Sequence, residues 1–280
     1  MIGARRFAPP PTMSPDFLAS ARALWQHRVD GTTLAALPEA GRPRTAAEGM
    51  AIQTAWAEHA GQPVAGWKIA ATSTAGQAHI HVSGPLPGRI LRSFVHAQGE
   101  VVPLRGNRMR VVEPEYAFRL ATDLPPQAAH RSLDEVMAAV ASLHPSFEVP
   151  DSRFSDFTQA GEAQLLADDA CCGRFLFGPA APEGWRTLDL ASHRVQATVT
   201  AADGRLRLQR DGEGRAVLGD PRLALHWLAN ALSGFGLGLR AGDYASVGTC
   251  MVPLAIEPGD RVQADYGVLG QLAIELGRDG

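Results

Sequence analysis

Three glutamates lie in short apolar stretches of the chain. Glu113 and Glu115 belong to the stretch 111–118, and Glu148 belongs to the stretch 146–149. Side chains alternate along a strand, so Glu113 and Glu115 would point to the same side. Neighbouring carboxylates in apolar surroundings repel each other, so they need either solvent or a cation. Two interpretations are open: a solvated strand face, or an all-oxygen site that suits Mg²⁺, Mn²⁺ or Ca²⁺ better than Zn²⁺.

A second candidate is the lone lysine of the chain. Of the 26 basic residues, 25 are arginines and one is Lys68. A bias of the genome toward arginine codons explains the excess of arginine. The exception then marks a position where a compact ammonium with an adjustable pKa serves and a guanidinium does not. Lys68 is therefore predicted to be a catalytic residue.

The composition limits the class of protein. The chain has 280 residues, of which 45% are hydrophobic and 20% charged, as in an ordinary globular protein. A net charge of −3 offers no basic field for nucleic acid or an anionic membrane, and neither is expected as a partner. Three cysteines, two of them adjacent, and a first segment without an apolar core indicate a reduced, cytoplasmic protein.

The elements that must position these residues are mixed in type. Capping signals at Ser14 and Thr45 predict two helices in the first third, and a capping box at Ser132 predicts a helix that continues to Leu143. Short apolar stretches separated by Gly and Pro predict strands from Val64 onward, with a hairpin at 194–210. Asp168 and Asp169 are interpreted as a helix or turn cap. The order of elements indicates an α+β fold with a largely antiparallel or mixed sheet.

Several segments, in order along nearly the whole chain, resemble the 2-keto-4-pentenoate hydratase and 4-oxalocrotonate decarboxylase group of the fumarylacetoacetate hydrolase superfamily. The matching segments are Gly66-Trp67-Lys68-Ile69 with Thr72-Ser73, Glu113-Pro114-Glu115, and the segments 147–153, 166–171, 224–230 and 239–248. The chain departs from the hydratase pattern in three places. It has no acid in 83–88, Asp169 stands where the family has Asn, and Cys171 stands where it has Ser.

The resemblance implies a mixed β-roll core, residues 63–280, preceded by a helical region with a flexible tail, residues 1–62. It implies a Mg²⁺ or Mn²⁺ ion held by Glu113, Glu115 and Glu148, and homo-oligomers. It also places Lys68 at the family's active-site lysine. By the same resemblance, Thr72, Ser73, Asp169 and Cys171 are expected to contact substrate.

The function implied by the resemblance is enol chemistry on a small 2-oxo acid, as in a 2-keto-4-pentenoate (2-hydroxypenta-2,4-dienoate) hydratase. The metal would stabilise the negative charge that develops on the substrate, and Lys68 would move a proton if the site lowers its pKa. Three alternatives remain: a 4-oxalocrotonate decarboxylase, an acylpyruvate hydrolase that cleaves a carbon–carbon bond, and a non-catalytic protein that binds 2-oxo acids.

Overall fold

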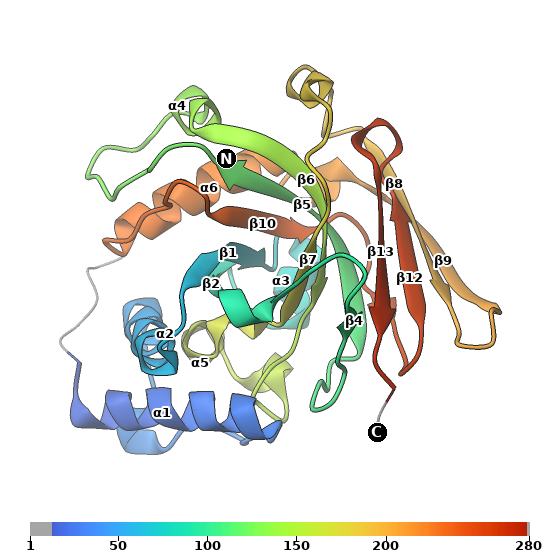
Figure 1. The fold of residues 1–280 in the computed structure, drawn as a ribbon. Coiled ribbons are helices and arrows are strands. Elements are labelled where there is room, and N and C mark those ends of the chain that lie inside the picture. Colours follow the sequence, from blue (N-terminus) through green and yellow to red (C-terminus); the bar gives the residue numbers. More distant parts are fainter. Residues whose placement is uncertain (1–12, 279–280) are drawn as a thin grey trace.

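The computed structural model describes residues 13–278, so the predicted flexible tail at 1–12 lies outside the described residues. Two sheets and six α-helices make up the described chain (Figure 1). The helices are α1 (Pro15–Asp30), α2 (Ala46–Ala60), α3 (Thr74–His79), α4 (Leu133–Ala138), α5 (Glu162–Ala167) and α6 (Pro221–Gly234). A short 3₁₀ turn, η4 (Asp169–Cys171), follows α5.

The larger sheet has eight strands, and it positions all three glutamates. Its strand order is β2-β1-β10-β5-β6-β7-β3, with β11 paired to β5. These strands are β1 (Val64–Ala70), β2 (Leu86–Leu91), β3 (Val95–His96), β5 (Val111–Leu120), β6 (Val140–Val149), β7 (Arg174–Phe177), β10 (Tyr244–Thr249) and β11 (Leu254–Ala255). The sheet is mixed: β1 is parallel to β10, while β5 is antiparallel to both of its neighbours, β10 and β6. It curls around α3 into a half-barrel (Figure 1).

The smaller sheet has five strands in the order β4-β13-β12-β8-β9 and lies against one side of the half-barrel (Figure 1). Its strands are β4 (Val101–Val102), β8 (Arg194–Thr200), β9 (Leu206–Glu213), β12 (Arg261–Asp265) and β13 (Gln271–Leu276). The predicted hairpin is the pair β8 and β9. The prediction of an α+β, mixed β-roll fold is thus confirmed.

The first two helices begin where their caps predict. Ser14 accepts a hydrogen bond from the Phe17 amide at the start of α1, and Thr45 with Glu48 forms a capping box at the start of α2. Apolar side chains of both helices pack in one cluster with Ile90, Leu91 and Phe175 of the larger sheet. The division of the chain at residue 62 stays a prediction.

One helix is shorter than the sequence indicates. The capping box at Ser132 does start α4, but the helix ends at Ala138, and Val140 already belongs to β6. The apolar side chains of Val140 and Leu143 are compatible with a helix or with a strand. Because β6 pairs with β5 from Glu113 to Leu120, this segment forms a strand.

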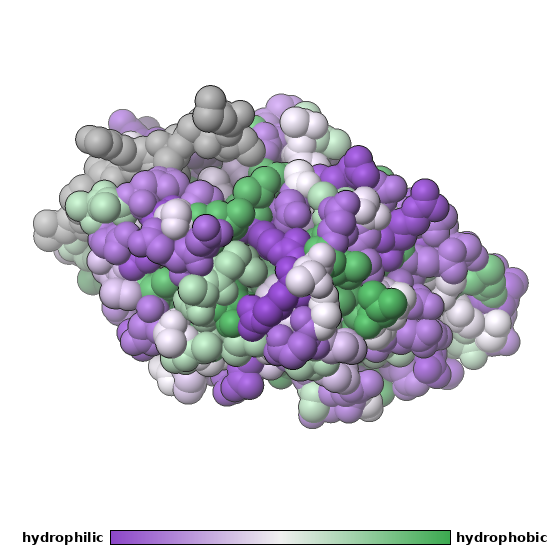
Figure 2. Space-filling view, turned by 90° about the horizontal axis from the view of Figure 1, so that it is seen from above, coloured by the Kyte–Doolittle hydropathy of each residue, from purple (hydrophilic) through white to green (hydrophobic). Residues whose placement is uncertain are grey.

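Among residues 13–278, no helix is long and apolar enough to cross a membrane. On the face drawn in Figure 2, hydrophilic side chains predominate and hydrophobic ones form small patches between them. Small apolar patches of this kind are normal on a protein surface and indicate no particular partner.

Candidate metal centre

The three predicted glutamates converge on the concave face of the larger sheet. Glu113 and Glu115 lie two residues apart on β5, and Glu148 on β6 pairs directly with Glu113. One carboxylate oxygen from each residue lies within 4.8 Å of the others. Glu115 and Glu148 are buried and Glu113 is partly buried. The solvated-face interpretation is therefore excluded for this cluster.

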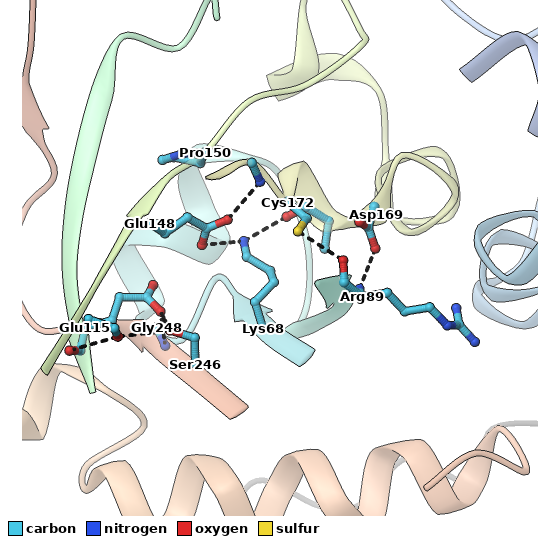
Figure 3. Close-up of polar contacts among 12 residues, drawn as sticks. Lys68, Arg89, Glu115, Glu148, Pro150, Asp169, Cys172, Ser246 and Gly248 are labelled. Atoms are coloured by element: carbon cyan, nitrogen blue, oxygen red, sulfur yellow. Dashed lines mark hydrogen bonds and ion pairs between the residues drawn. The ribbon is translucent and has the colours of Figure 1, made fainter. Parts of the chain in front are cut away.

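Strand β10 supplies the donors that hold Glu115. Its Oε2 accepts hydrogen bonds from Ser246 Oγ at 2.6 Å and from the Gly248 amide at 3.3 Å (Figure 3). The register of β10 against β5 shifts between Ser246 and Thr249, and Gly248 has a φ of 101°. The extra residue of this bulge turns the Gly248 amide away from the strand ladder and toward the carboxylate.

Lys68 on β1 lies between Glu148 and the turn η4 (Figure 3). Its Nζ is 3.1 Å from Glu148 Oε2 and donates a hydrogen bond to the Ala170 carbonyl at 3.0 Å. The other oxygen of Glu148, Oε1, accepts a hydrogen bond from the Gly173 amide at 3.2 Å. The lone lysine of the chain is thus buried beside the three glutamates, and its catalytic role stays a prediction.

The three carboxylates at the centre carry more negative charge than the single ammonium of Lys68 can balance. Burial and the charge of Glu148 raise the pKa of Glu113 to about 7, and burial also raises the pKa of Glu115 and of Glu148. Burial alone would lower the pKa of Lys68, but the charges of Glu148 and Glu113 outweigh burial and raise it above its ordinary value. A lowered pKa of Lys68, the condition for proton transfer by this residue, stays a prediction. A dication among the carboxylates would cancel the charges that raise it.

The donor set fits a hard divalent cation. Within residues 13–278, the buried Glu115 Oε1 has no hydrogen-bond partner, although a buried carboxylate oxygen without one costs free energy. One ammonium faces three carboxylates, and all the candidate ligand atoms are oxygens. Such a set is typical of sites for Mg²⁺, Mn²⁺ or Ca²⁺.

The turn η4 is strained. Asp169, Ala170 and Cys171 have φ values of 62°, 53° and 58°, in the left-handed region that costs a non-glycine residue about 1–2 kcal/mol. The Ala170 carbonyl accepts from Lys68, and the Cys171 carbonyl accepts from the Asp151 amide. These hydrogen bonds stabilise the strained turn, and the bond from Lys68 also orients the lysine.

Gly88 on β2 lets η4 approach the sheet. A Cβ atom on Gly88 would lie 2.4 Å from the Asp169 carbonyl oxygen and 3.1 Å from Lys68 Cδ. The Asp169 carboxylate accepts a hydrogen bond from the neighbouring Arg89 amide, so its side chain lies on the Arg89 side of the turn (Figure 3). Burial raises the pKa of Asp169 to about 7. The segment 83–88 itself has no acid, and Asp169 brings a carboxylate to its end.

The other predicted substrate contacts lie around the centre. Cys171 is buried, and burial raises the pKa of its thiol to about 12, so the thiol is neutral. Thr72 is buried against Gly248: a Cβ on that glycine would lie 2.4 Å from Thr72 Oγ1. Ser73 caps α3, where its Oγ accepts from the Gly76 amide. Contact of Thr72, Ser73, Asp169 and Cys171 with substrate stays a prediction.

The structure also adds residues that the sequence did not single out. Asp168 stands at the cap position between α5 and η4, as predicted, but its side chain makes no cap hydrogen bond. Its Oδ2 accepts from Ser152 Oγ and from the Arg153 amide, which joins η4 to the segment after β6. Ser246 and Gly248 were within a segment resembling the family, but that resemblance assigned them no role. Nothing in the sequence singled out Gly173, because it contacts Glu148 through its backbone amide and not through a side chain.

The inner face of the curled mixed sheet thus gathers three carboxylates and a lysine into a site that suits a divalent cation. No protein-family model matches this chain. The chain is 31% identical over 221 residues to a 2-hydroxyhexa-2,4-dienoate hydratase of Comamonas testosteroni, which covers 78% of this chain and 80% of that protein. It is 29% identical to a 2-keto-4-pentenoate hydratase of Paraburkholderia xenovorans, over 92% of this chain and 93% of that protein.

Among solved structures, the fold is similar to that of the 4-oxalocrotonate decarboxylase from Pseudomonas putida G7, complexed with magnesium and adipate. The TM-score is 0.81, with 25% sequence identity over 95% of this chain and 99% of that one. The chain belongs to the family of 2-keto-4-pentenoate and related dienoate hydratases. Its fold is also that of more distant structures, among them a protein described as a putative fumarylacetoacetate hydrolase family protein. The protein is therefore an enzyme of the hydratase and decarboxylase type, and a divalent metal is supported by its acidic cluster and by the metal-bound neighbour.

Proposed function

We propose that this enzyme is a hydratase of 2-hydroxypenta-2,4-dienoate or a close relative of that acid. The observation that carries the proposal is the set Glu113, Glu115 and Glu148 with Lys68 Nζ 3.1 Å from Glu148 Oε2. The similarity to two hydratases over most of the chain supports it.

The three glutamates would hold Mg²⁺ or Mn²⁺, which supplies Lewis-acid stabilisation of negative charge on the substrate when bound. Ser246 and Gly248 keep the Glu115 carboxylate in place through its Oε2 and leave its Oε1 for the ion. The Ala170 carbonyl and Glu148 fix the Lys68 ammonium at the edge of the carboxylate cluster. From there Lys68 would donate a hydrogen bond to a substrate oxygen and hand over a proton.

Decarboxylation of 4-oxalocrotonate is the second candidate. It is favoured by the TM-score of 0.81 to a decarboxylase and by the absence of an acid in 83–88, where hydratases of the group usually have one. Both reactions pass through the same kind of enol or enolate, so the same residues can serve either.

The test is an assay of the metal-free protein before and after addition of Mg²⁺ or Mn²⁺. We expect metal-dependent loss of the dienol absorbance of 2-hydroxypenta-2,4-dienoate, and no activity in Glu115→Gln. Glu183→Gln, which changes a glutamate with a side chain 77% exposed, is the matched control and should keep full activity. Release of CO₂ from 4-oxalocrotonate without hydration of the dienoate would instead assign the decarboxylase.

Two further outcomes would contradict both candidates. Turnover of an acylpyruvate alone would indicate a carbon–carbon hydrolase. Metal-dependent binding of oxalate with no turnover of any of these acids would indicate a non-catalytic binder. Cytoplasmic location, homo-oligomer formation and the choice between Mg²⁺ and Mn²⁺ remain predictions.

A further inference from the structure

A polar cavity lies next to the end of β6, where Val149 and Gly173 line it. It has a volume of about 70 Å³. Its charged and amide-bearing lining residues are Arg28, Arg105, Asn107, Asp151, Arg153 and Arg174. Lys68 and the three glutamates do not line it. A bound water needs only about 10–15 Å³ of such space, so the cavity has room for a carboxylate or phosphate group.

Two glycines shape one wall of this cavity. Gly31 ends α1, Gly106 lies in the loop before β5, and both have left-handed φ values, 66° and 77°. A Cβ atom on Gly106 would lie 2.9 Å from the Gly31 Cα. The end of α1, which carries Arg28, is thus packed directly against the loop that carries Arg105 and Asn107.

Two buried guanidinium nitrogens in the lining have no hydrogen-bond partner within residues 13–278. They are Arg28 Nη2 and Arg153 Nε. Arg153 is only 3% exposed, so solvent does not satisfy its Nε. Arg28 uses Nη1 to donate to the Cys172 carbonyl and stacks over the ring of Phe94, which leaves Nη2 available. Buried donors of this kind nearly always have a partner in the functional state of a protein.

The lining carries an excess of positive charge. Four arginines and one carboxylate line it, and the oxygens of that carboxylate, Asp151, already accept from the Arg108 amide and the Arg153 guanidinium. Asp168, which does not line the cavity, offsets part of the charge of Arg28 and Arg153. Burial and the nearby charge of Arg28 lower the pKa of Arg153 to about 10. The arginines therefore repel one another in the absence of a further anion.

We propose that this cavity is a binding site for a small oxyanion, a carboxylate or a phosphate, distinct from the metal centre. The planar fork of a guanidinium matches both groups, because each can accept two parallel hydrogen bonds. The anion would accept hydrogen bonds from the unpartnered nitrogens of Arg28 and Arg153 and would balance the charge of Arg174, which also lines the cavity. The site borders the metal centre through Gly173, which lines the cavity and donates to Glu148.

Calorimetric titration of the metal-free full-length protein with inorganic phosphate tests the proposal, with succinate as a second probe. We expect one anion per chain, and binding at least about tenfold weaker in Arg28→Gln, because charge-assisted hydrogen bonds are lost. Stronger binding of succinate than of phosphate would identify the natural ligand as a carboxylate, and the reverse order as a phosphate.

Arg194→Gln is the matched control, since it removes the same charge from a side chain that is 86% exposed and does not line the cavity. If Arg28→Gln does not fold, Arg174→Gln gives the same comparison from a partly buried position. The proposal is overturned if the wild type binds neither anion, or if the cavity variants bind as tightly as Arg194→Gln. No turnover is measured, so this result is independent of the proposed reaction.

Discussion

Glu113 and Glu148 face each other directly across the antiparallel strands β5 and β6. Like charges at such a pair repel, and Glu115 adds a third carboxylate on the same face. Lys68 contacts Glu148 and compensates only part of this charge. The sheet therefore holds a costly arrangement that a divalent cation would stabilise.

The first prediction concerns that stabilisation. Saturating Mg²⁺ should raise the Tm of the metal-free protein by about 5 °C or more, because a ligand at about 100 times its Kd adds about 2.7 kcal/mol. Glu113→Gln should lose most of this increase, whereas Glu183→Gln should keep it. Differential scanning calorimetry with and without EDTA measures the effect. Equal shifts in all three proteins would contradict the assigned ligands.

The pH dependence of the metal-free protein follows from Glu113. Its pKa is raised from 4.5 to about 7, so between these values the folded state binds more protons than the unfolded state. Raising the pH through this range therefore favours unfolding, and the free energy of unfolding should fall between about pH 4.5 and 7. Urea titrations at several pH values should show a shallower fall in Glu113→Gln. A stability that rises over this range in the wild type would refute the prediction.

Asp169→Asn tests the contribution of Asp169 to the pH dependence separately from that of Glu113. Burial raises the pKa of Asp169 from 3.8 to about 7, so its ionised form is unfavourable in the folded state. The asparagine keeps an oxygen for the Arg89 amide and removes the charge. We expect this variant to be more stable than the wild type by about 1–3 kcal/mol at pH 8 and to differ little from it at pH 4, because the difference builds up between the two pKa values. Chemical denaturation at the two pH values decides, and a variant destabilised at pH 8 would show that the ionised form is needed.

Ser246 is expected to position a metal ligand without touching the ion. Removing its 2.6 Å hydrogen bond in Ser246→Ala frees the Glu115 carboxylate to turn. Loss of such a supporting contact weakens metal binding by about 10- to 100-fold. Ser192→Ala, which removes an exposed hydroxyl bonded only to Asp189, is the control. Metal titration followed by calorimetry gives both affinities, and identical values would leave Ser246 with a structural role alone.

The last prediction concerns the effect of Lys68 on the catalytic rate. Lys68→Met should lower kcat by about 10²- to 10⁴-fold, because proton transfer by a positioned side chain contributes that much. Lys68→Arg should not restore the rate, since a guanidinium keeps its proton and is larger than the ammonium that contacts both Glu148 and the Ala170 carbonyl. Rates are compared at saturating metal, and far-UV circular dichroism confirms folding. Wild-type activity in Lys68→Arg would mean that the rarity of lysine in this chain was coincidental.

Local sequence determined the elements and the chemistry of the centre. The caps at Ser14 and Thr45 start helices where predicted, because a side-chain oxygen three residues before a free amide is a short-range interaction. The spacing of Glu113 and Glu115 puts both on one face of β5, because the side-chain period of a strand is two residues. The rarity of lysine singled out Lys68, which the structure places against Glu148.

Tertiary structure decided which groups meet. The register of β6 against β5 brings Glu148 opposite Glu113, and the bulge at Gly248 turns an amide toward Glu115. The left-handed turn at Ala170 and the cavity lined by Arg28 and its neighbours join segments more than 100 residues apart. Such contacts depend on strand pairing and on backbone conformations that are stable only once the whole chain has packed. Local sequence propensities therefore do not predict these contacts.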